Sequence, residues 1–439
     1  MKKISDNISC KVASAFVTVL LLLALLPSAS FALFGDSDKA FGLAGSVRGI
    51  ALYSDPYDFP AFFGTDGDAD TTLSGILRVT ALGRPTEKFS YEFHAVTHYD
   101  HFSASGGDAL SSTGKLKYRA WDEAWDISNG EHHASSLFID RASVKISLSR
   151  ADLTIGRQAV TFGKAWFWNP LDLFSPFDAT QFDRDYKAGV DAIRLDAPFS
   201  DFSGATVIYV AGRELDGSGG YATKENFGAE WTGSALIGRL YATIKGFDLA
   251  LSGGKVYGGL HAGAGASGEL GQLALRFEAA GFFADDNGPA LPFPLAGDLY
   301  EDSVTAVIGI GHRFDNSLDI EAEYLINSGG AGEDWNEAFS RFQKGAIPQM
   351  SRNVLGFSAS YEINPLATGR ISVIQSLSAP ISTNISPSLT ISLTDNAEAI
   401  MGASINAGKR PKAPLGAPEI KSEFGSFPSQ FYVEIKQYF

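Results

Sequence analysis

The chain has 439 residues, of which 45% are hydrophobic, and it carries a net charge of −15 at pH 7. The acidic balance argues against a nucleic-acid partner. Its only cysteine, Cys10, lies in the N-terminal segment, so the rest of the chain has no disulfide, thiolate metal site or covalent c-type haem. Beyond that segment there is no run of about 18 apolar residues, and no membrane-spanning helix is expected.

The first segment has the pattern of a secretory signal. Lysines precede the apolar stretch 12–26, and Ser30-Phe31-Ala32 places small residues where signal peptidase recognises them. An apolar run of roughly 15 residues is shorter than the span of about 20 that a membrane anchor needs. We expect residues 1–32 to be a cleaved signal peptide. Its three lysines and one aspartate leave with it, which makes the net charge −17.

The remainder, 33–439, has the pattern of one all-β domain. Segments of about ten residues alternate apolar and polar side chains, as in Phe431-Tyr432-Val433-Glu434 near the C-terminus. Such segments suit a single antiparallel up-and-down transmembrane β-barrel with lipid outside and water inside. We expect about 18 strands, with 16 as the alternative. The expected strands are 41–53, 71–84, 88–99, 136–148, 153–162, 187–197, 204–213, 231–243, 247–258, 260–270, 272–283, 303–314, 318–327, 352–363, 369–378, 387–394, 397–406 and 431–439.

The connections alternate in length. Short turns such as Asp315-Asn316 and Asn364-Pro365 follow even-numbered strands, and long connections mostly follow odd-numbered ones. This predicts short periplasmic turns and long outer loops in the outer membrane of a Gram-negative cell. The outer loops 54–70 and 284–300 are acidic. Their carboxylates either share divalent cations with lipopolysaccharide or are simply solvated. The terminal Phe439 is expected to be recognised by the barrel-insertion machinery and to seal the seam between the first and last strands.

Charged side chains fall on the polar phase of several strands, where they should face the lumen. Two interpretations fit this pattern. The charges either set a field across the pore or pair with one another and only hold water. Under the first interpretation, Arg141, Lys145 and Arg157 should give a mild anion preference. The predicted lumen residues are Arg141, Lys145, Arg157, Arg276, Arg313, Arg352, Arg370, Asp319, Glu321 and Glu323.

The most distinctive block runs from Ile155 to Asp196. It contains Ile155-Gly156-Arg157-Gln158, then an aromatic stretch over 166–178, then Asp183-Arg184-Asp185. At these residues the chain resembles bacterial outer-membrane porins of the alginate-export-like kind. The resemblance implies a passive channel, which in some members of that group has an arginine-lined path for anionic polysaccharide.

The long connection 163–186 is rich in Trp, Phe and Pro. It is expected to fold into the barrel mouth and narrow it, and its aromatic rings are expected to provide surfaces on which sugar rings stack. The alternative is that these aromatics belong to the girdle at the membrane edge. The predicted loop residues are Trp166, Trp168, Phe174, Phe177, Asp183 and Arg184.

No enzymatic motif stands out. The histidines His98, His101, His132 and His133 lack the fixed spacing of a known metal site. We therefore expect a porin without cofactor, through which small polar or anionic solutes diffuse. The alternative is a barrel sheath or export conduit for a periplasmic electron-transfer cytochrome or a polysaccharide. The oligomeric state stays open.

Overall fold

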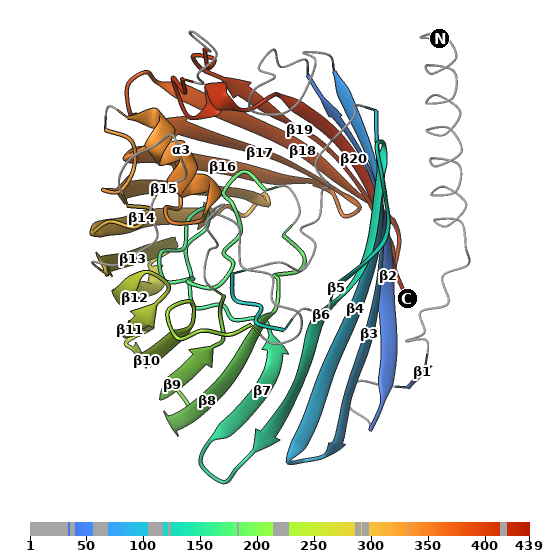
Figure 1. Ribbon diagram of the computed structural model, residues 1–439, viewed down its shortest axis with the longest axis vertical. Coiled ribbons are helices and arrows are strands. Elements are labelled where there is room, and N and C mark those ends of the chain that lie inside the picture. The colour runs from blue at the N-terminus through green and yellow to red at the C-terminus, as the bar shows by residue number, and fades with distance from the viewer. Residues whose placement is uncertain are drawn as a thin grey trace.

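The computed structural model describes residues 34–35, 40–55, 69–103, 117–121, 124–181, 184–213, 228–285, 291, 298–332, 334–412 and 419–439. Within these ranges the chain forms one closed antiparallel β-barrel, with chain segments folded inside it (Figure 1). The predicted signal peptide lies outside the described residues. No helix in the described part is long and apolar enough to cross a membrane.

Eighteen strands of the described chain form the closed ring, which confirms the predicted fold and strand number. The ring strands are β2 (Gly42–Ser54), β3 (Asp70–Thr86), β4 (Phe89–Phe102), β6 (His133–Ser147), β7 (Asp152–Gln158), β8 (Val190–Ser200), β9 (Ser203–Val210), β10 (Ala235–Ile244), β11 (Phe247–Val256), β12 (Gly259–Leu270), β13 (Leu273–Ala284), β14 (Ser303–Arg313), β15 (Leu318–Asn327), β16 (Asn353–Asn364), β17 (Ala367–Ser376), β18 (Ser382–Thr394), β19 (Ala397–Ala407) and β20 (Gln430–Tyr438).

Four further elements were not predicted. The two-residue β1 (Phe34–Gly35) pairs with β2, and β5 (Ala124–Gly130) pairs with the end of β6 that the short β7 leaves uncovered. Helix α3 (Trp335–Gln343) and the 3₁₀ turn η2 (Phe424–Ser426) lie in two long connections. Strand β7 ends at Gln158, so the prediction that it continues to 162 is wrong.

The ring closes between the first and last long strands. Strands β2 and β20 pair from Ser46 opposite Tyr438 to Ser54 opposite Gln430. Beyond that ladder, Phe439 and Gly45 exchange two backbone hydrogen bonds of 2.8 and 3.0 Å. Closure gives each of the eighteen ring strands a partner on both sides, which lets the ring strands satisfy their backbone groups inside a bilayer.

Side chains of the wall alternate as the sequence predicts. On β20, Phe431 and Val433 point outward and are 48% and 47% exposed, whereas Glu434 is fully buried inside. On β14, Ile308 points outward at 62% exposure and Val307 inward at 1%. The outward apolar belt is the surface that a membrane barrel presents to lipid.

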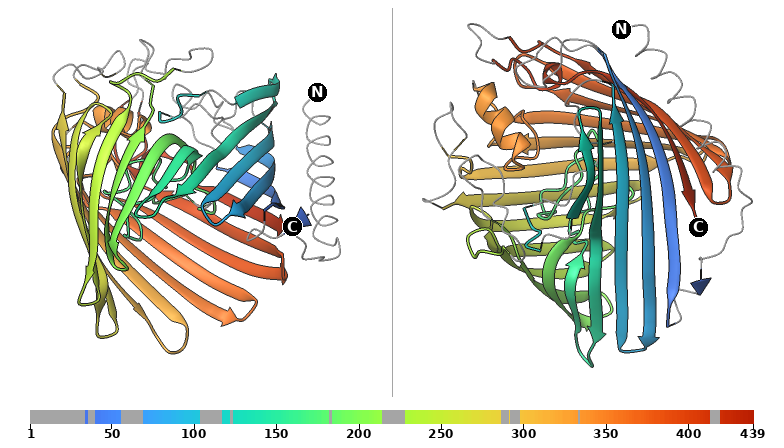
Figure 2. Two further views of the ribbon diagram at one scale, coloured as in Figure 1. Left: turned by 90° about the horizontal axis from the view of Figure 1, so that it is seen from below. Right: turned by 45° about the vertical axis from the view of Figure 1, so that its right-hand side comes forward.

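The tight turns gather at one end of the barrel (Figure 2). These are the turns between β3 and β4, between β6 and β7, and between β8 and β9, and the turns that directly follow β10, β12, β14, β16 and β18. The other end carries the long connections together with two short ones, 257–258 and 377–381. We call these the tight-turn end and the long-loop end.

Two local irregularities change which side chains point inward. In β6 the register shifts where His94 faces Arg141 and Ala95 faces Ile139, so Asp140 is an extra residue. As a result both Asp140 and Arg141 reach polar partners inside.

In β7, Gly156 has φ +115°, and a Cβ added there would lie 2.2 Å from the carbonyl oxygen of Ala142. Only glycine adopts this conformation easily. It turns the chain so that Arg157 and Gln158 are both buried.

Candidate solute pathway

The connection between β7 and β8 crosses the lumen. Residues 159–189, here called the constriction loop, leave the wall after Gln158 and rejoin it at Val190. In Figure 1 this segment lies inside the ring of strands. Its buried side chains belong to two separate apolar clusters on different parts of the wall.

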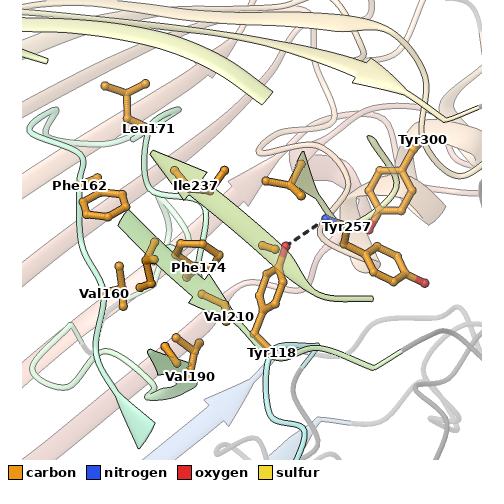
Figure 3. Close-up of a cluster of buried hydrophobic side chains, with 14 of the residues drawn as sticks. Tyr118, Val160, Phe162, Leu171, Phe174, Val190, Val210, Ile237, Tyr257 and Tyr300 are labelled. Atoms are coloured by element: carbon orange, nitrogen blue, oxygen red, sulfur yellow. Dashed lines mark hydrogen bonds between the residues drawn. The ribbon is translucent and has the colours of Figure 1, made fainter. Parts of the chain in front are cut away.

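The first cluster fixes one side of the loop to strands β8–β11. Val160, Phe162, Leu171 and Phe174 of the loop pack with inward side chains such as Ile237 (Figure 3). The ring of Phe174 meets Tyr118 edge-on at 5.1 Å between centroids. Burial of such side chains stabilises the packed position by about 1.5–3 kcal/mol each.

The second cluster fixes the middle of the loop to the wall formed by β14–β17. Phe167 and Trp168 pack against inward residues that include Val307, Leu325 and Ile374. The indole nitrogen of Trp168 also donates a 2.9 Å hydrogen bond to Gln349. Because the two clusters lie on different walls, the loop spans the lumen and divides it.

Two carboxylates of the wall hold the backbone of the loop. Glu278 on β13 accepts hydrogen bonds from the N–H groups of Lys164, Ala165 and Leu171. Glu323 on β15 accepts from Trp166 and Phe167. Four consecutive loop amides are therefore bound by two buried carboxylates, and hydrogen bonds to charged groups are among the stronger ones in proteins.

The returning half of the loop carries its own polar contacts. Lys187 forms a buried ion pair with Asp172, and burial lowers the pKa of Lys187. Arg184 donates to the backbone carbonyls of Trp166, Asp178 and Ala179. Its charge is therefore oriented by neutral acceptors rather than cancelled by a hydrogen-bonded carboxylate.

A cavity of about 820 Å³, here called the pore cavity, lies beside the constriction loop. Loop residues from Trp166 to Asp185 line one side, and β17–β20 with β2 and β3 line the other. Its wall is rich in hydroxyl and amide groups, which suits a path for hydrated solutes. The polar side chains from β17–β19 include Ser372, Asn384, Ser386, Ser388, Thr390 and Ser404.

Charge in the pore cavity is unevenly paired. Lys436 forms ion pairs with Asp185 at 2.6 Å and Glu398 at 3.6 Å. By contrast, Arg370 on β17 has no ion pair or hydrogen bond with any part of the chain that the structure describes. Its guanidinium carbon lies 5.7 Å from the ring centre of Trp166, and its charge acts on the nearby Arg184. Arg184 and Arg370 thus place two positive charges at the cavity surface, which Asp55, Asp70 and Asp178 line as well, and the charge of Asp178 acts on Arg184.

A buried acid also borders the pore cavity. Glu423, in the connection before β20, accepts hydrogen bonds from the Gln349 amide at 2.6 Å and from the backbone N–H of Met350 at 2.8 Å. Burial raises the pKa of Glu423 to about 7. Near neutral pH this carboxyl is therefore divided between its neutral and charged forms.

Several of the predicted lumen charges form ion pairs. Arg141 pairs with Glu92 at 2.8 Å, Lys145 with Asp152 at 2.7 Å, and Arg157 with Asp191 at 2.7 Å. Arg276 pairs with Glu321 on β15. None of these four cations lines the pore cavity.

The remaining predicted lumen charges lie elsewhere in the barrel and make other contacts. Arg313 lies at the tight-turn end opposite Asp319 in the ladder, and Arg352 donates to the carbonyl of Gly330 at 3.1 Å. Glu323 holds the constriction loop. Of the ten predicted lumen residues, Arg370 alone lines the pore cavity.

The loop aromatics are not equivalent. Trp166 lines the pore cavity, but Trp168 and Phe174 are 3% and 0% exposed and pack into the two apolar clusters. Phe177 is half-buried and does not line the cavity. Asp183 lies outside the described residues. Trp168 and Phe174 do not line the pore cavity, so of the predicted aromatic residues only Trp166 faces it.

Sequence reasoning missed most of the pore cavity wall. The signal was present in β18, where Asn384, Ser386, Ser388 and Thr390 repeat on one face. Lys436, Asp185 and Glu398 had no comparable signal, since only the closed fold brings them together.

One hydrogen-bonded chain has the connectivity of a hydrolytic triad. Ser136 Oγ lies 2.8 Å from His98 Nε2, and His98 Nδ1 lies 3.2 Å from Asp100. All three residues are at most 2% exposed, and none of them lines the pore cavity. Among the described residues, no group of three or more His, Cys, Asp or Glu is placed to hold a metal ion.

The barrel is similar to solved outer-membrane porins. Pseudomonas aeruginosa OccK5 (OpdH) matches with a TM-score of 0.54 at 9% identity, over 92% of this chain and 99% of that one. Acinetobacter baumannii OccAB1 matches with a TM-score of 0.56 at 11% identity, over 93% and 99%. Pseudomonas aeruginosa OpdK, crystallised with vanillate, matches with a TM-score of 0.50 at 10% identity, over 90% and 98%.

Identities this low show the fold alone. No family model matches the sequence, and none of the curated proteins matches it either.

Proposed function

We propose that this chain is an outer-membrane channel through which small polar and anionic solutes diffuse passively along the pore cavity. The observation that carries the proposal is that a hydroxyl-rich wall and two arginines, Arg184 and Arg370, line the same cavity. Confined charges in a narrow, partly desolvated space act strongly on passing ions.

The size of the cavity supports diffusion of small solutes over the sheath alternative. A volume of about 820 Å³ is small beside that of a folded protein domain. A folded cytochrome does not fit in such a space while the constriction loop is packed on both walls. Passage of a protein partner would require both apolar clusters to separate.

The proposed anion preference is assigned to different residues from those first predicted. Arg141, Lys145 and Arg157 each have a carboxylate partner, so their fields are largely cancelled. Arg184 contacts carbonyl oxygens, and Arg370 lies over Trp166. We therefore propose that Arg184 and Arg370 set the selectivity.

Two finer assignments belong to the proposal. Cleavage after Ala32 and a periplasmic tight-turn end follow from the signal pattern and the loop lengths, and N-terminal sequencing that begins at Leu33 tests the first. Membership of the alginate-export-like porins rests on the resemblance over Ile155–Asp196 alone. Flux of short alginate oligomers through the purified protein tests it.

The test of the channel function is a flux assay. Purified protein in liposomes should admit small neutral sugars and organic anions, with rates that fall steeply as solute size grows. In a planar bilayer under a KCl gradient, the zero-current potential should favour chloride. A protein that gives no swelling and no conductance after verified barrel insertion would overturn the proposal.

A further inference from the structure

A second cavity lies on the other side of the constriction loop. This space, here called the side pocket, has a volume of about 300 Å³ and is lined by the loop and by β10–β13. It is separate from the pore cavity, since the two share no lining residue. The lining side chains that could contact a ligand include Phe162, Lys164, Leu171, Phe202, Arg239 and Ser267.

The side pocket is closed towards the long-loop end. Phe162 and Leu171 belong both to its lining and to the first apolar cluster, which fills the barrel beyond them (Figure 3). Its other lining residues include Phe202 and Thr243, which lie at or beside tight turns. The pocket is therefore a dead end that opens at the tight-turn end and not a second route across the barrel.

The glycine-rich strand β12 makes room on this side of the barrel. A Cβ on Gly263 or Gly265 would lie 2.5 or 2.8 Å from the methyl groups of Leu171. Small residues at these positions let the loop pack closely against the wall beside Glu278. The side pocket is what remains between that contact and the tight turns.

Two cations line the side pocket without a hydrogen-bonded carboxylate among the described residues. Neither the Arg239 guanidinium nor the Lys164 ammonium forms an ion pair or hydrogen bond with the described part of the chain. The Nε of Arg239 is buried without an acceptor. The guanidinium carbon lies 5.3 Å from the ring centre of Phe162 and 5.1 Å from that of Tyr241, so this charge is held between aromatic faces.

Three of the four carboxylates near these cations already accept other hydrogen bonds or pair with another group, and the charges of Asp196 and Glu278 also act on Arg239. Glu278 accepts from three loop amides, and Asp248 accepts from Thr243 Oγ1 at 2.6 Å. Asp196 pairs with Arg194 at 2.8 Å. Asp201 lies in the turn at the mouth. A buried donor without an acceptor costs about 1–3 kcal/mol, which an anionic ligand would recover.

We propose that the side pocket binds an organic anion with a small aromatic or branched apolar body, which enters from the tight-turn end. The anionic group lies between Arg239 and Lys164, and the apolar body lies against Phe162, Leu171 and Phe202. An inorganic anion gains only the first contact, and a neutral aromatic compound gains only the second.

The test uses the full-length mature barrel in detergent and three probes: benzenesulfonate, inorganic sulfate and benzyl alcohol. Calorimetric titration should show one site for benzenesulfonate, with at least tenfold weaker binding of the other two probes. Arg239→Gln and Lys164→Gln should each weaken benzenesulfonate binding about tenfold. Ala250→Phe, which fills the side pocket from β11 without changing charge, should abolish it.

The matched control is Arg370→Gln, which removes a guanidinium from the pore cavity instead. It should leave benzenesulfonate binding unchanged. Loss of binding in Arg370→Gln together with retention in Arg239→Gln would assign the ligand to the pore cavity and overturn the proposal, while leaving the channel function intact. Equal binding by wild type and Ala250→Phe, with each variant's folding verified by heat-modifiable migration, would overturn it as well.

Discussion

The carboxylate of Glu323 on β15 accepts a 2.8 Å hydrogen bond from the backbone N–H of Phe167 in the constriction loop. It also binds the N–H of Trp166. A wall carboxylate thus fixes a loop that lies far away in sequence, and the backbone contact does not depend on the loop side chain. The width of the pore cavity is therefore set by the wall as much as by the loop.

Neutralising this carboxylate should loosen the loop. Glu323→Gln keeps one carbonyl acceptor but turns an N–H₂ group towards a second amide, which should weaken the anchored position by about 2 kcal/mol. We expect a larger and noisier single-channel conductance in planar bilayers.

The matched control is Glu321→Gln, two residues away on the same face of β15. Glu321 pairs with Arg276 and forms no hydrogen bond to the described part of the loop. Its conductance should stay close to that of wild type. Identical traces for all three proteins would show that the apolar clusters alone hold the loop.

Arg370 should control ion selectivity. A unit positive charge about 7 Å from a passing ion attracts chloride and repels potassium by roughly 0.6 kcal/mol each in water, which together correspond to about a sevenfold change in the chloride-to-potassium permeability ratio. Arg370→Gln should lower that ratio by about this factor, as measured from the zero-current potential. Arg276→Gln is the control, because it removes an arginine that is paired with Glu321 and does not line the pore cavity. A larger change in the control would place selectivity elsewhere in the barrel.

The strands were predictable because alternation and turn residues are local properties. In β20 the outward residues, such as Phe431 and Val433, recur at every second position, with inward residues between them. The same period predicted Arg141 to point inward but gave no hint of the extra residue Asp140, which depends on register with β4. The short strand β5 pairs with the part of β6 that β7 does not reach, and no local pattern in the sequence predicts this pairing.

The site was less predictable because it depends on contacts between distant segments. Nothing local distinguishes Trp166, which lines the pore cavity, from Trp168, which is buried against β14–β17. Likewise Arg370 and Arg276 look alike in sequence, but only Arg276 has a carboxylate within reach, because Glu321 on β15 extends past the glycines of β14 to pair with it. The positive φ of Gly156 explains the inward turn of Arg157 that alternation alone would not give.

Selectivity should depend on pH through Glu423. Its pKa of about 7 lies above the usual 4.5, so the carboxyl is neutral in acid and becomes charged as the pH rises through about 7. The added negative charge borders the pore cavity and, at about 7 Å from a passing ion, should lower the chloride-to-potassium permeability ratio by about fivefold between pH 6 and pH 8. Because the folded state holds this proton more tightly than the unfolded chain, the free energy of unfolding should fall as the pH rises from about 4.5 to about 7.

Glu423→Gln should remove this pH dependence and keep selectivity near that of wild type at pH 6. The groups that face Glu423 are the Ser351 hydroxyl, the Met350 N–H and the Gln349 amide, together with the charge of Asp178, whose field also disfavours ionisation. A wild-type permeability ratio that is constant from pH 6 to pH 8 would contradict the prediction.

Deleting Phe439 should weaken assembly at the seam. The deletion removes the two backbone hydrogen bonds with Gly45 and the aromatic ring that lies against that glycine. We expect less heat-modifiable barrel in the outer membrane and more degraded protein in the periplasm. Phe439→Tyr keeps both the backbone and an aromatic ring, so its yield should match wild type. Normal assembly of the deletion would show that the terminal aromatic is incidental.

The seam also contains a buried ion pair whose loss should destabilise the barrel. Arg48 on β2 donates from Nε to Glu434 on β20 at 2.8 Å, and the two residues are 4% and 0% exposed. Removing one partner leaves an uncompensated buried charge, which costs about 3–5 kcal/mol. Glu434→Ala should therefore lower the temperature at which the barrel unfolds in detergent, followed by heat-modifiable migration on gels.

The double variant Arg48→Met with Glu434→Leu separates charge burial from packing. It removes both charges and keeps similar side-chain volume, so it should recover most of the stability that Glu434→Ala loses. Glu398→Ala is a second control, because that carboxylate makes only a 3.6 Å contact with Lys436 and is half-buried, so its effect should stay below about 1 kcal/mol. If the double variant unfolds as early as Glu434→Ala, the pair contributes a specific favourable interaction at the seam that apolar packing does not replace.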